Sequence, residues 1–133
     1  MKHTPTGCGA FKNLEYYPKR KDNKKINGFS NTYKRMSWDK PAPIRTMNNG
    51  NIGSCDNVHP GYLKSDGTYS DARVLTIHEL LIISSLPTDW NIPNWVNETL
   101  IRQVIGEGIP PLLMKNILRE IKIKDEKSRI LNN

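Results

Sequence analysis

Apolar residues recur at helical spacing in the second half of the chain, between Ala72 and Ile121. Thr76 and Glu79 have the spacing of a capping box, in which the two side chains satisfy the first free backbone N–H groups of a helix. The apolar positions that follow belong to one helical face: Ile77, Leu80 and Leu81. Pro87 interrupts this pattern, so the spacing predicts a helix that begins after Thr76 and ends before Pro87.

Two more helices are expected downstream. Asn97 is a suitable N-cap, and the apolar positions after it are Leu100, Ile101, Val104 and Ile105. The segment Gly106–Gly108 ends that helix, and Pro110-Pro111 begins a third, because proline is favoured at the first helical position. The apolar stripe of this third helix consists of Leu113, Ile117 and Ile121, with Met114 and Leu118 beside it.

The first half of the chain is rich in glycine, proline and asparagine and predicts loops with short strands. Asn27–Asp39 is expected to form a turn and then a strand, in which Lys34 and Arg35 point to opposite faces. Asn49-Gly50 is a strong turn signal and predicts a hairpin within Ile44–Cys55. Asp66-Gly67 predicts a second turn. The expected fold class is therefore α+β, with a loop-rich N-terminal half and three helices in the C-terminal half.

Charge is distributed unevenly along the 133 residues. Residues 1–45 contain 11 Lys/Arg and 3 Asp/Glu, a balance of +8, whereas residues 46–133 contain 9 and 10, a balance of −1. The densest basic run combines Lys19-Arg20-Lys21 with Lys24-Lys25. Such asymmetry indicates either contact with a polyanion, for which the DNA backbone is the obvious candidate, or a solubilising segment.

Cysteine usage and hydropathy exclude several classes of protein. Cys8 and Cys55 are too few for a disulfide framework. Cys55 and His59 lie four residues apart, but a zinc site needs three or four ligands, so no metal site is predicted. No stretch approaches the roughly 20 apolar residues of a membrane span, and no signal peptide is recognised. We therefore expect a cytoplasmic location and no contact with a membrane.

The order of several short motifs resembles the C-terminal end of DNA (cytosine-5)-methyltransferases. These are R-x-L-T-x-x-E-L within Arg73–Leu86, an L-P-x-D-W turn at Leu86–Trp90, and R-Q-x-x-G-x-x-I-P-P-x-L at Arg102–Leu113. They are similar to the ninth and tenth conserved motifs of that family. Tyr33–Pro43 and His59-Pro60 resemble the end of its target-recognition region, so the likeness covers residues 28–121.

The resemblance implies three segments and a larger fold. Residues 1–71 would be the basic, loop-rich end of the target-recognition region. Residues 72–121 would be the helical segment with the ninth and tenth motifs, and residues 122–133 a charged tail that frays from the last helix. In the family such a segment packs on an α/β domain that binds S-adenosyl-L-methionine, so the chain is expected to be part of that larger fold.

The resemblance also implies a partner and residues that contact it. The candidates for contact with double-stranded DNA are Lys34, Arg35, Arg45, Thr46 and Arg73. Arg45 has the chemistry to bond a guanine edge bidentately or to touch phosphate, and the sequence does not choose between these. Arg73 and Glu79 match an arginine and a glutamate that help organise the recognition region in the family. Without the resemblance, Arg73 would be interpreted as a surface arginine and Glu79 as a helix-capping glutamate.

The tenth motif lines part of the S-adenosyl-L-methionine pocket in the family. This resemblance gives Gly106, Glu107, Gly108 and Ile109 as candidates for contact with the cofactor. Relatives commonly have asparagine where this chain has Glu107, so the amide donor is lost there.

The motifs that carry out methyl transfer in the family are not found in this sequence. Cys8 follows Gly7 and Cys55 follows Ser54, so neither cysteine belongs to a Pro-Cys motif, and no E-N-V motif occurs. No catalytic residue is therefore expected here, and the cofactor would bind only with a catalytic half, in the same longer chain or in a separate subunit. The alternatives are a truncated gene product, a DNA-binding module without catalysis, and an unrelated basic interaction protein.

Overall fold

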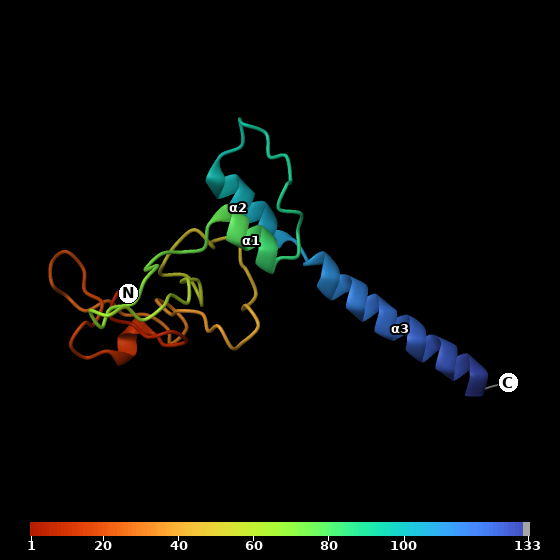
Figure 1. Cartoon of the computed structure of the whole chain (residues 1–133), viewed down its shortest axis with the longest axis horizontal. Coiled ribbons are helices and arrows are strands. Elements are labelled where there is room, and N and C mark those ends of the chain that lie inside the picture. The colour runs from red at the N-terminus through yellow and green to blue at the C-terminus, as the bar shows by residue number, and fades with distance from the viewer. Residues whose placement is uncertain (132–133) are drawn as a thin grey trace.

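The computed structural model describes the backbone of residues 1–131 and the side chains of residues 1–124. An irregular body formed by the N-terminal half precedes two short packed helices, α1 and α2, and a long helix, α3, extends away from both (Figure 1). The elements are a 3-10 turn at Ala10–Lys12, α1 at Ile77–Ile83, α2 at Glu98–Glu107 and α3 at Pro111–Leu131.

The helix boundaries confirm the predicted caps. Thr76 accepts a hydrogen bond from the backbone N–H of Glu79 at 3.2 Å, and the Glu79 carboxylate accepts one from the Thr76 N–H at 2.7 Å. Asn97 accepts from the N–H of Leu100 at 2.8 Å. These bonds satisfy N–H groups that have no partner within the helix. The third helix begins at Pro111 as predicted but continues to Leu131, beyond the expected end at Ile121. Residues 132–133 of the predicted tail lie outside the described residues.

The predicted strands do not form. In the part of the chain that the structure describes, strand pairing is limited to isolated bridges, including Gly9 with Lys34 and Arg35 with Val58. The hairpin expected within Ile44–Cys55 is wrong: a turn is present at Asn49-Gly50, but among the described residues no bridge pairs the segments on its two sides. The buried Asn49 side chain instead donates to the carbonyls of Thr46 and Arg102. The observed architecture is therefore helical and irregular, with very little β structure. The turn at Asp66-Gly67 is present, beside the bridge between Leu63 and Tyr69.

The hydrophobic core is small and lies between the irregular body and α1–α2. It consists of Met36, Leu75, Leu80, Leu81 and Ile105, with Ile77, Leu86 and Ile101 packed against it. A core of this size supplies limited hydrophobic stabilisation, so polar contacts must fix much of the loop conformation. No helix among the described residues has the length and apolar character to cross a membrane.

Arg35 organises the irregular body from its interior. Its guanidinium is fully buried and donates five hydrogen bonds of 2.7–3.2 Å to backbone carbonyls, those of Met1, His59, Pro60, Ser70 and Asp71. Lys34, the preceding residue, points outward and forms an ion pair of 2.8 Å with Asp56. The predicted alternation of these two side chains is thus confirmed. Contact between Arg35 and DNA stays a prediction that this structure does not favour, because the side chain is fully buried.

Replacing Arg35 with alanine is expected to destabilise the chain by about 3 kcal/mol or more, because buried carbonyls from three segments lose their donor. Replacing Lys34 with alanine should cost about 1 kcal/mol or less, because its ion pair is partly exposed. Urea denaturation of both variants measures the difference. Equal, small losses would show that the arginine does not hold the loops together.

Candidate functional site

An ion pair between Arg73 and Glu79 joins the irregular body to the start of α1. The Arg73 Nη1 donates to Glu79 Oε2 at 2.7 Å, and Nη2 donates to Oε1 at 3.0 Å. Arg73 also contacts Asp71, through Nε at 3.1 Å. The same Glu79 oxygen that binds Nη1 accepts the capping bond from Thr76, so one carboxylate fixes both the helix start and the arginine. Bidentate pairs of this kind restrict geometry strongly.

His59 extends this cluster toward the body. Its Nε2 lies 3.6 Å from Glu79 Oε1, and its Nδ1 accepts a hydrogen bond of 3.0 Å from the Gly61 N–H. Burial lowers the pKa of His59 below 6.5, which favours the neutral ring. The hydrogen bond from Arg73, together with the Thr76 contacts, lowers the pKa of Glu79 to about 2. No group of three or more His, Cys, Asp or Glu suited to a metal occurs among the residues described.

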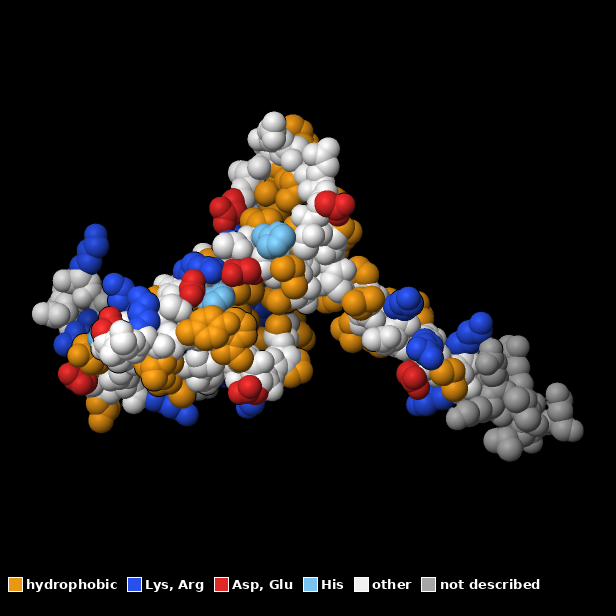
Figure 2. Space-filling view, in the orientation of Figure 1, with side chains coloured by type: hydrophobic (Ala, Val, Ile, Leu, Met, Phe, Trp, Pro, Cys, Tyr) orange, Lys and Arg blue, Asp and Glu red, His pale blue; other side chains and the backbone are white. Residues whose placement is uncertain are grey.

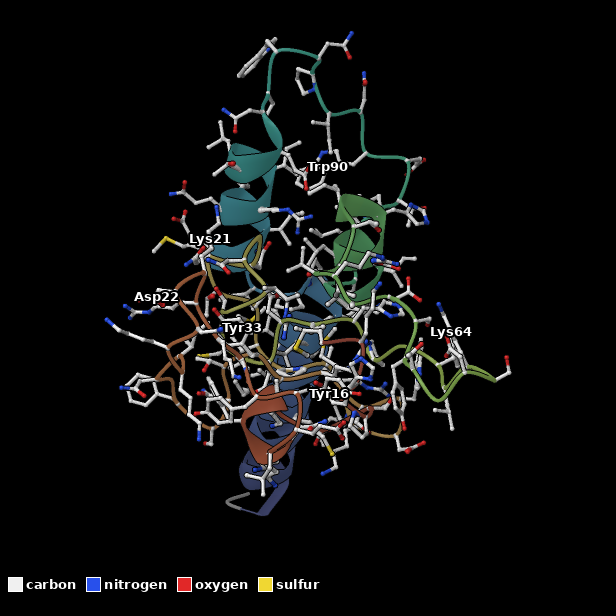
Figure 3. All side chains as sticks on the ribbon, turned by 90° about the vertical axis from the view of Figure 1, so that its left-hand side faces the viewer. Tyr16, Lys21, Asp22, Tyr33, Lys64 and Trp90 are labelled. Carbon is white, nitrogen blue, oxygen red and sulfur yellow. The ribbon has the colours of Figure 1, made fainter. Side chains whose placement is uncertain are left out.

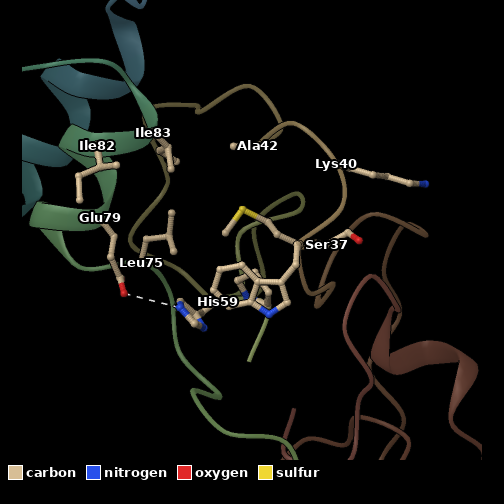
Figure 4. A pocket seen from close by; sticks show the side chains of 11 residues that line it. Ser37, Lys40, Ala42, His59, Leu75, Glu79, Ile82 and Ile83 are labelled. Atoms are coloured by element: carbon tan, nitrogen blue, oxygen red, sulfur yellow. Dashed lines mark ion pairs between the residues drawn. The ribbon is translucent and has the colours of Figure 1, made fainter. Parts of the chain in front are cut away.

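A cleft of about 300 Å³ lies beside the cluster, between α1 and the loop that follows Met36 (Figure 4). Glu79 and His59 line one edge, and Figure 4 shows Leu75, Ile82 and Ile83 along the cleft. Trp38 also lines it, packing edge-on against His59 and donating from its indole N–H to the Gly61 carbonyl at 3.0 Å. His59 and Trp38 thus pack against each other at the wall of the cleft.

Arg45 and Thr46, two candidates for DNA contact, lie on the loop before Asn49. The Arg45 guanidinium donates to the Pro43 carbonyl at 2.9 Å, to Asn57 Oδ1 at 3.0 Å and to the Asp56 carbonyl at 3.1 Å. Burial lowers the pKa of Arg45, and the nearby Asp56 carboxylate opposes this shift. Thr46 is exposed. Arg73, in contrast, already has its charge balanced by two carboxylates.

The four candidates for cofactor contact lie where α2 leads into α3: Gly106 and Glu107 end α2, and Gly108 and Ile109 belong to the connection. Gly106 packs so closely on Thr46 that a Cβ there would overlap the Thr46 carbonyl. Gly108 caps α2, donating its N–H to the Val104 carbonyl at 3.1 Å. Glu107 is exposed, and Ile109 is 60% exposed. The backbone of this connection is thus fixed while its outer side chains remain accessible.

Arg102 and Asn49 hold this connection against the body, a function that the sequence pattern did not reveal. Asn49 donates to the Arg102 carbonyl at 2.7 Å. The buried Arg102 guanidinium donates to the Leu75 carbonyl at 2.8 Å and to Glu98 Oε1 at 2.6 Å. The available signal was an arginine at an otherwise apolar helical face, four residues after an acidic one. The motifs around Arg73 and Arg102 are therefore fixed to the same irregular body.

Apolar hollows lie next to Ile109. One of about 150 Å³ is lined by Ser84, Leu86, Trp90, Val104, Ile105, Gly108, Ile109 and Pro110. A larger one of about 280 Å³ continues along α2 and is walled by the loop that contains Trp90 and Trp95. The tenth-motif connection thus opens onto apolar surface.

The Arg73–Glu79 pair predicts an acid-sensitive stability. Because folding lowers the Glu79 pKa from 4.5 to about 2, its stabilisation is complete above pH 4.5 and is lost as the pH falls toward 2. Solvent screening limits this contribution to about 1–2 kcal/mol. Glu79→Gln should remove that part of the pH dependence in urea denaturation, whereas Glu107→Gln should keep it. An unchanged profile in Glu79→Gln would contradict the role of the pair.

Comparison with known proteins gives a consistent set of relatives. Residues 1–123 match the family model described as C-5 cytosine-specific DNA methylase. Type II methyltransferase M1.HgaI of Avibacterium volantium is 54% identical over 121 residues, which are 91% of this chain and 34% of that protein. Type II methyltransferase M.AgeI of Thalassovita gelatinovora is 31% identical over 72% of this chain and 20% of its own length.

A third relative is much shorter. Type II methyltransferase M.AquIB of Picosynechococcus sp. is 28% identical over 103 residues, which are 70% of this chain and 64% of that protein. No solved structure matches the chain significantly. The chain thus spans about a third of M1.HgaI but most of M.AquIB. Since the family model covers nearly all of the sequence, the resemblance read from the motifs is confirmed, and the chain belongs to the C-5 cytosine-specific DNA methylase family.

Proposed function

We propose that this chain is the C-terminal part of a DNA (cytosine-5-)-methyltransferase. In this proposal it helps recognise double-stranded DNA and closes one side of the S-adenosyl-L-methionine pocket. A catalytic half, in the same longer chain or in a separate subunit, supplies the reacting groups. The observation that carries the proposal is the uncovered apolar face of α3, directly after the tenth motif.

The apolar stripe of α3 has the properties of an interface. Its large side chains are between 45% and 58% exposed: Leu112, Leu113, Ile117, Leu118 and Ile121. Figure 2 shows hydrophobic side chains along the part of α3 nearest the body. An amphipathic helix normally buries such a stripe, and a large exposed apolar patch marks a protein contact. In the proposed function, the α/β domain of the catalytic half covers this apolar stripe and completes the methyltransferase fold.

The chemistry of the reaction must come from that partner. A cysteine nucleophile and an acidic residue act on an extruded cytosine in this type of mechanism. The two cysteines of this chain, Cys8 and Cys55, are free and lie outside a Pro-Cys motif. We therefore expect no methyl transfer by this polypeptide alone.

The cofactor proposal rests on the connection between α2 and α3. Gly108 and Ile109 present backbone and an apolar side chain beside an apolar hollow, which fits one wall of a pocket for an adenine-containing ligand. Glu107, exposed beside it, places a carboxylate compatible with a sulfonium cation. When bound, S-adenosyl-L-methionine supplies the methyl group. The residues of this chain would position the ligand and exclude water on one side.

DNA contact is assigned to the exposed loop residues rather than to the buried arginines. Thr46 is exposed, and Arg45 and Lys34 are partly exposed on the same irregular body. Arg73 is assigned a positioning role, because the carboxylates of Glu79 and Asp71 already balance its charge. Arg35 is not assigned to DNA contact, because its side chain is buried.

A natural small subunit of a split methyltransferase is the second candidate. The observation that favours it is the high coverage of M.AquIB, a relative that is itself short. A DNA-binding module without catalysis is the remaining alternative, and the basic N-terminal segment favours it. Association with a catalytic half separates these cases.

Ile117→Asp tests the interface directly. The substitution places a charge in the α3 stripe and should weaken association with a catalytic half at least tenfold, measured by calorimetric titration. Since Ile117 is 45% exposed in the free chain, the unfolding midpoint should change little. Ser65→Asp adds the same charge in the exposed turn at Asp66-Gly67, outside the stripe, and should stay within about threefold of the unmodified chain. Equal affinities for both variants would show that the stripe is not the contact.

A further inference from the structure

The densest basic run of the sequence forms a closed hairpin. The Arg20 N–H donates to the Lys24 carbonyl at 2.8 Å, and the Ile26 N–H donates to the Pro18 carbonyl at 3.0 Å. Lys19 and Lys25 face each other in an antiparallel bridge between these bonds. At the tip, the Asn23 N–H donates to the Arg20 carbonyl, and Asn23 adopts a φ of 65°. A turn followed by a left-handed residue is a common hairpin connection, and asparagine tolerates that conformation.

Aromatic contacts anchor the base of this basic hairpin, defined as Pro18–Ile26. Tyr17 packs against Phe11 with ring centroids 5.5 Å apart, and Phe11 packs edge-on against Tyr33 at 5.7 Å. The Tyr17 hydroxyl donates to the Ile26 carbonyl at 3.3 Å. The hairpin is thus a positioned element of the body. Figure 3 shows Lys21 and Asp22 at one edge of the irregular body, and Figure 1 shows the N-terminal loops of this body at the end of the molecule away from α3.

The charges on the hairpin are mostly uncompensated. Asp22 is its one acidic residue and lies 3.6 Å from the Lys24 ammonium. Lys25 lies over the ring of Tyr17, at 5.1 Å. Among the described residues, no carboxylate pairs with the three remaining cations, which are exposed: Lys19, Arg20 and Lys21.

The pairing of Lys19 with Lys25 favours a polyanionic ligand. Like charges directly opposite in an antiparallel pair are destabilising, and bound phosphates would relieve that repulsion. A protein partner is disfavoured, because protein interfaces have apolar centres depleted of lysine and no apolar side chain projects from positions 19–25.

We propose that the basic hairpin Pro18–Ile26 binds the phosphate backbone of double-stranded DNA, outside the recognition loop that carries Arg45 and Thr46. This deepens the proposed function and rests on it for the identity of the ligand. The contact is independent of DNA sequence, because cations that meet phosphates carry no base information. It holds the duplex at the end of the molecule opposite α3, where the catalytic half would dock.

The test compares two triple variants of the full chain in binding to a fluorescent mixed-sequence duplex. Lys19→Gln, Arg20→Gln and Lys21→Gln together remove three charges from the hairpin. Lys64→Gln, Lys115→Gln and Arg119→Gln remove three exposed charges elsewhere. Each phosphate contact adds about 0.9 to the slope of log K against log salt. Between about 50 and 200 mM salt, the magnitude of this slope should be smaller by roughly 2 to 3 in the hairpin variant than in the unmodified chain. Near about 100 mM salt, the hairpin variant should bind the duplex at least tenfold more weakly.

The control triple should retain its slope within about one phosphate contact. Equal losses in the two triples would mean that net charge alone drives binding, and an unchanged hairpin triple would exclude the contact; either result overturns the proposal. Thermal unfolding should leave the midpoint of the hairpin triple unchanged or raised, because repulsion between Lys19 and Lys25 is removed.

A third variant keeps every charge of the hairpin but disrupts the turn at its tip. Asn23→Pro cannot adopt the observed φ and lacks the N–H that Asn23 donates to Arg20. A positioned hairpin predicts several-fold weaker binding to the same duplex. Unchanged binding would mean that the cations act as an unstructured segment, which contradicts the proposal.

The experiments distinguish failure of the hairpin contact from failure of the proposed function. If the hairpin triple loses its salt slope but the chain does not associate with a catalytic half, the hairpin contact stands and the proposed function fails. If association occurs and the two triples bind DNA equally, the proposed function stands and the hairpin contact fails.

Discussion

Buried arginine side chains are the interaction on which the rest of this structure depends. An irregular backbone lacks the ladders that satisfy carbonyl groups in sheets, and each buried carbonyl without a partner is costly. Arg35 serves five carbonyls from three segments at once, and Arg102 links the Leu75 carbonyl to α2. Because the core cluster of the described residues contains five buried apolar side chains, these polar contacts determine much of how the loops are arranged.

The same arrangement places the two family motifs on one rigid support. Arg73 and Glu79 connect the loop before α1 to the helix start, while Asn49 connects the loop that carries Arg45 to α2. A displacement of the loop that carries Arg45 would therefore also move the tenth-motif connection. This coupling fits the proposed function, in which the chain would hold a DNA surface and one wall of a cofactor pocket in a fixed relation to a catalytic half.

The sequence predicted local features that depend on a few neighbouring residues. The starts of all three helices followed from Thr76, Asn97 and Pro111, because caps and proline act within one turn of the helix. Asn49-Gly50 misled, since the amide of Asn49 bonds Arg102, more than fifty positions away. The burial of Arg35 was equally hidden, because its five acceptors come together only in the folded chain.

For the candidate site, the motifs identified the family, and the structure showed which side chains are exposed and which are held by contacts within the chain. Arg73 pairs with Glu79 through two hydrogen bonds, and the organising role that the resemblance implied for them stays a prediction. Gly106 is explained by its close approach to Thr46, a constraint that no local pattern expresses.

The direct measurement of the central claim is transfer of labelled methyl groups from S-adenosyl-L-methionine to mixed-sequence DNA. It is made with this chain alone, with a catalytic half carrying the Pro-Cys motif alone, and with both together. The account predicts transfer only in the mixture; transfer by this chain alone, or none in the mixture, would contradict it.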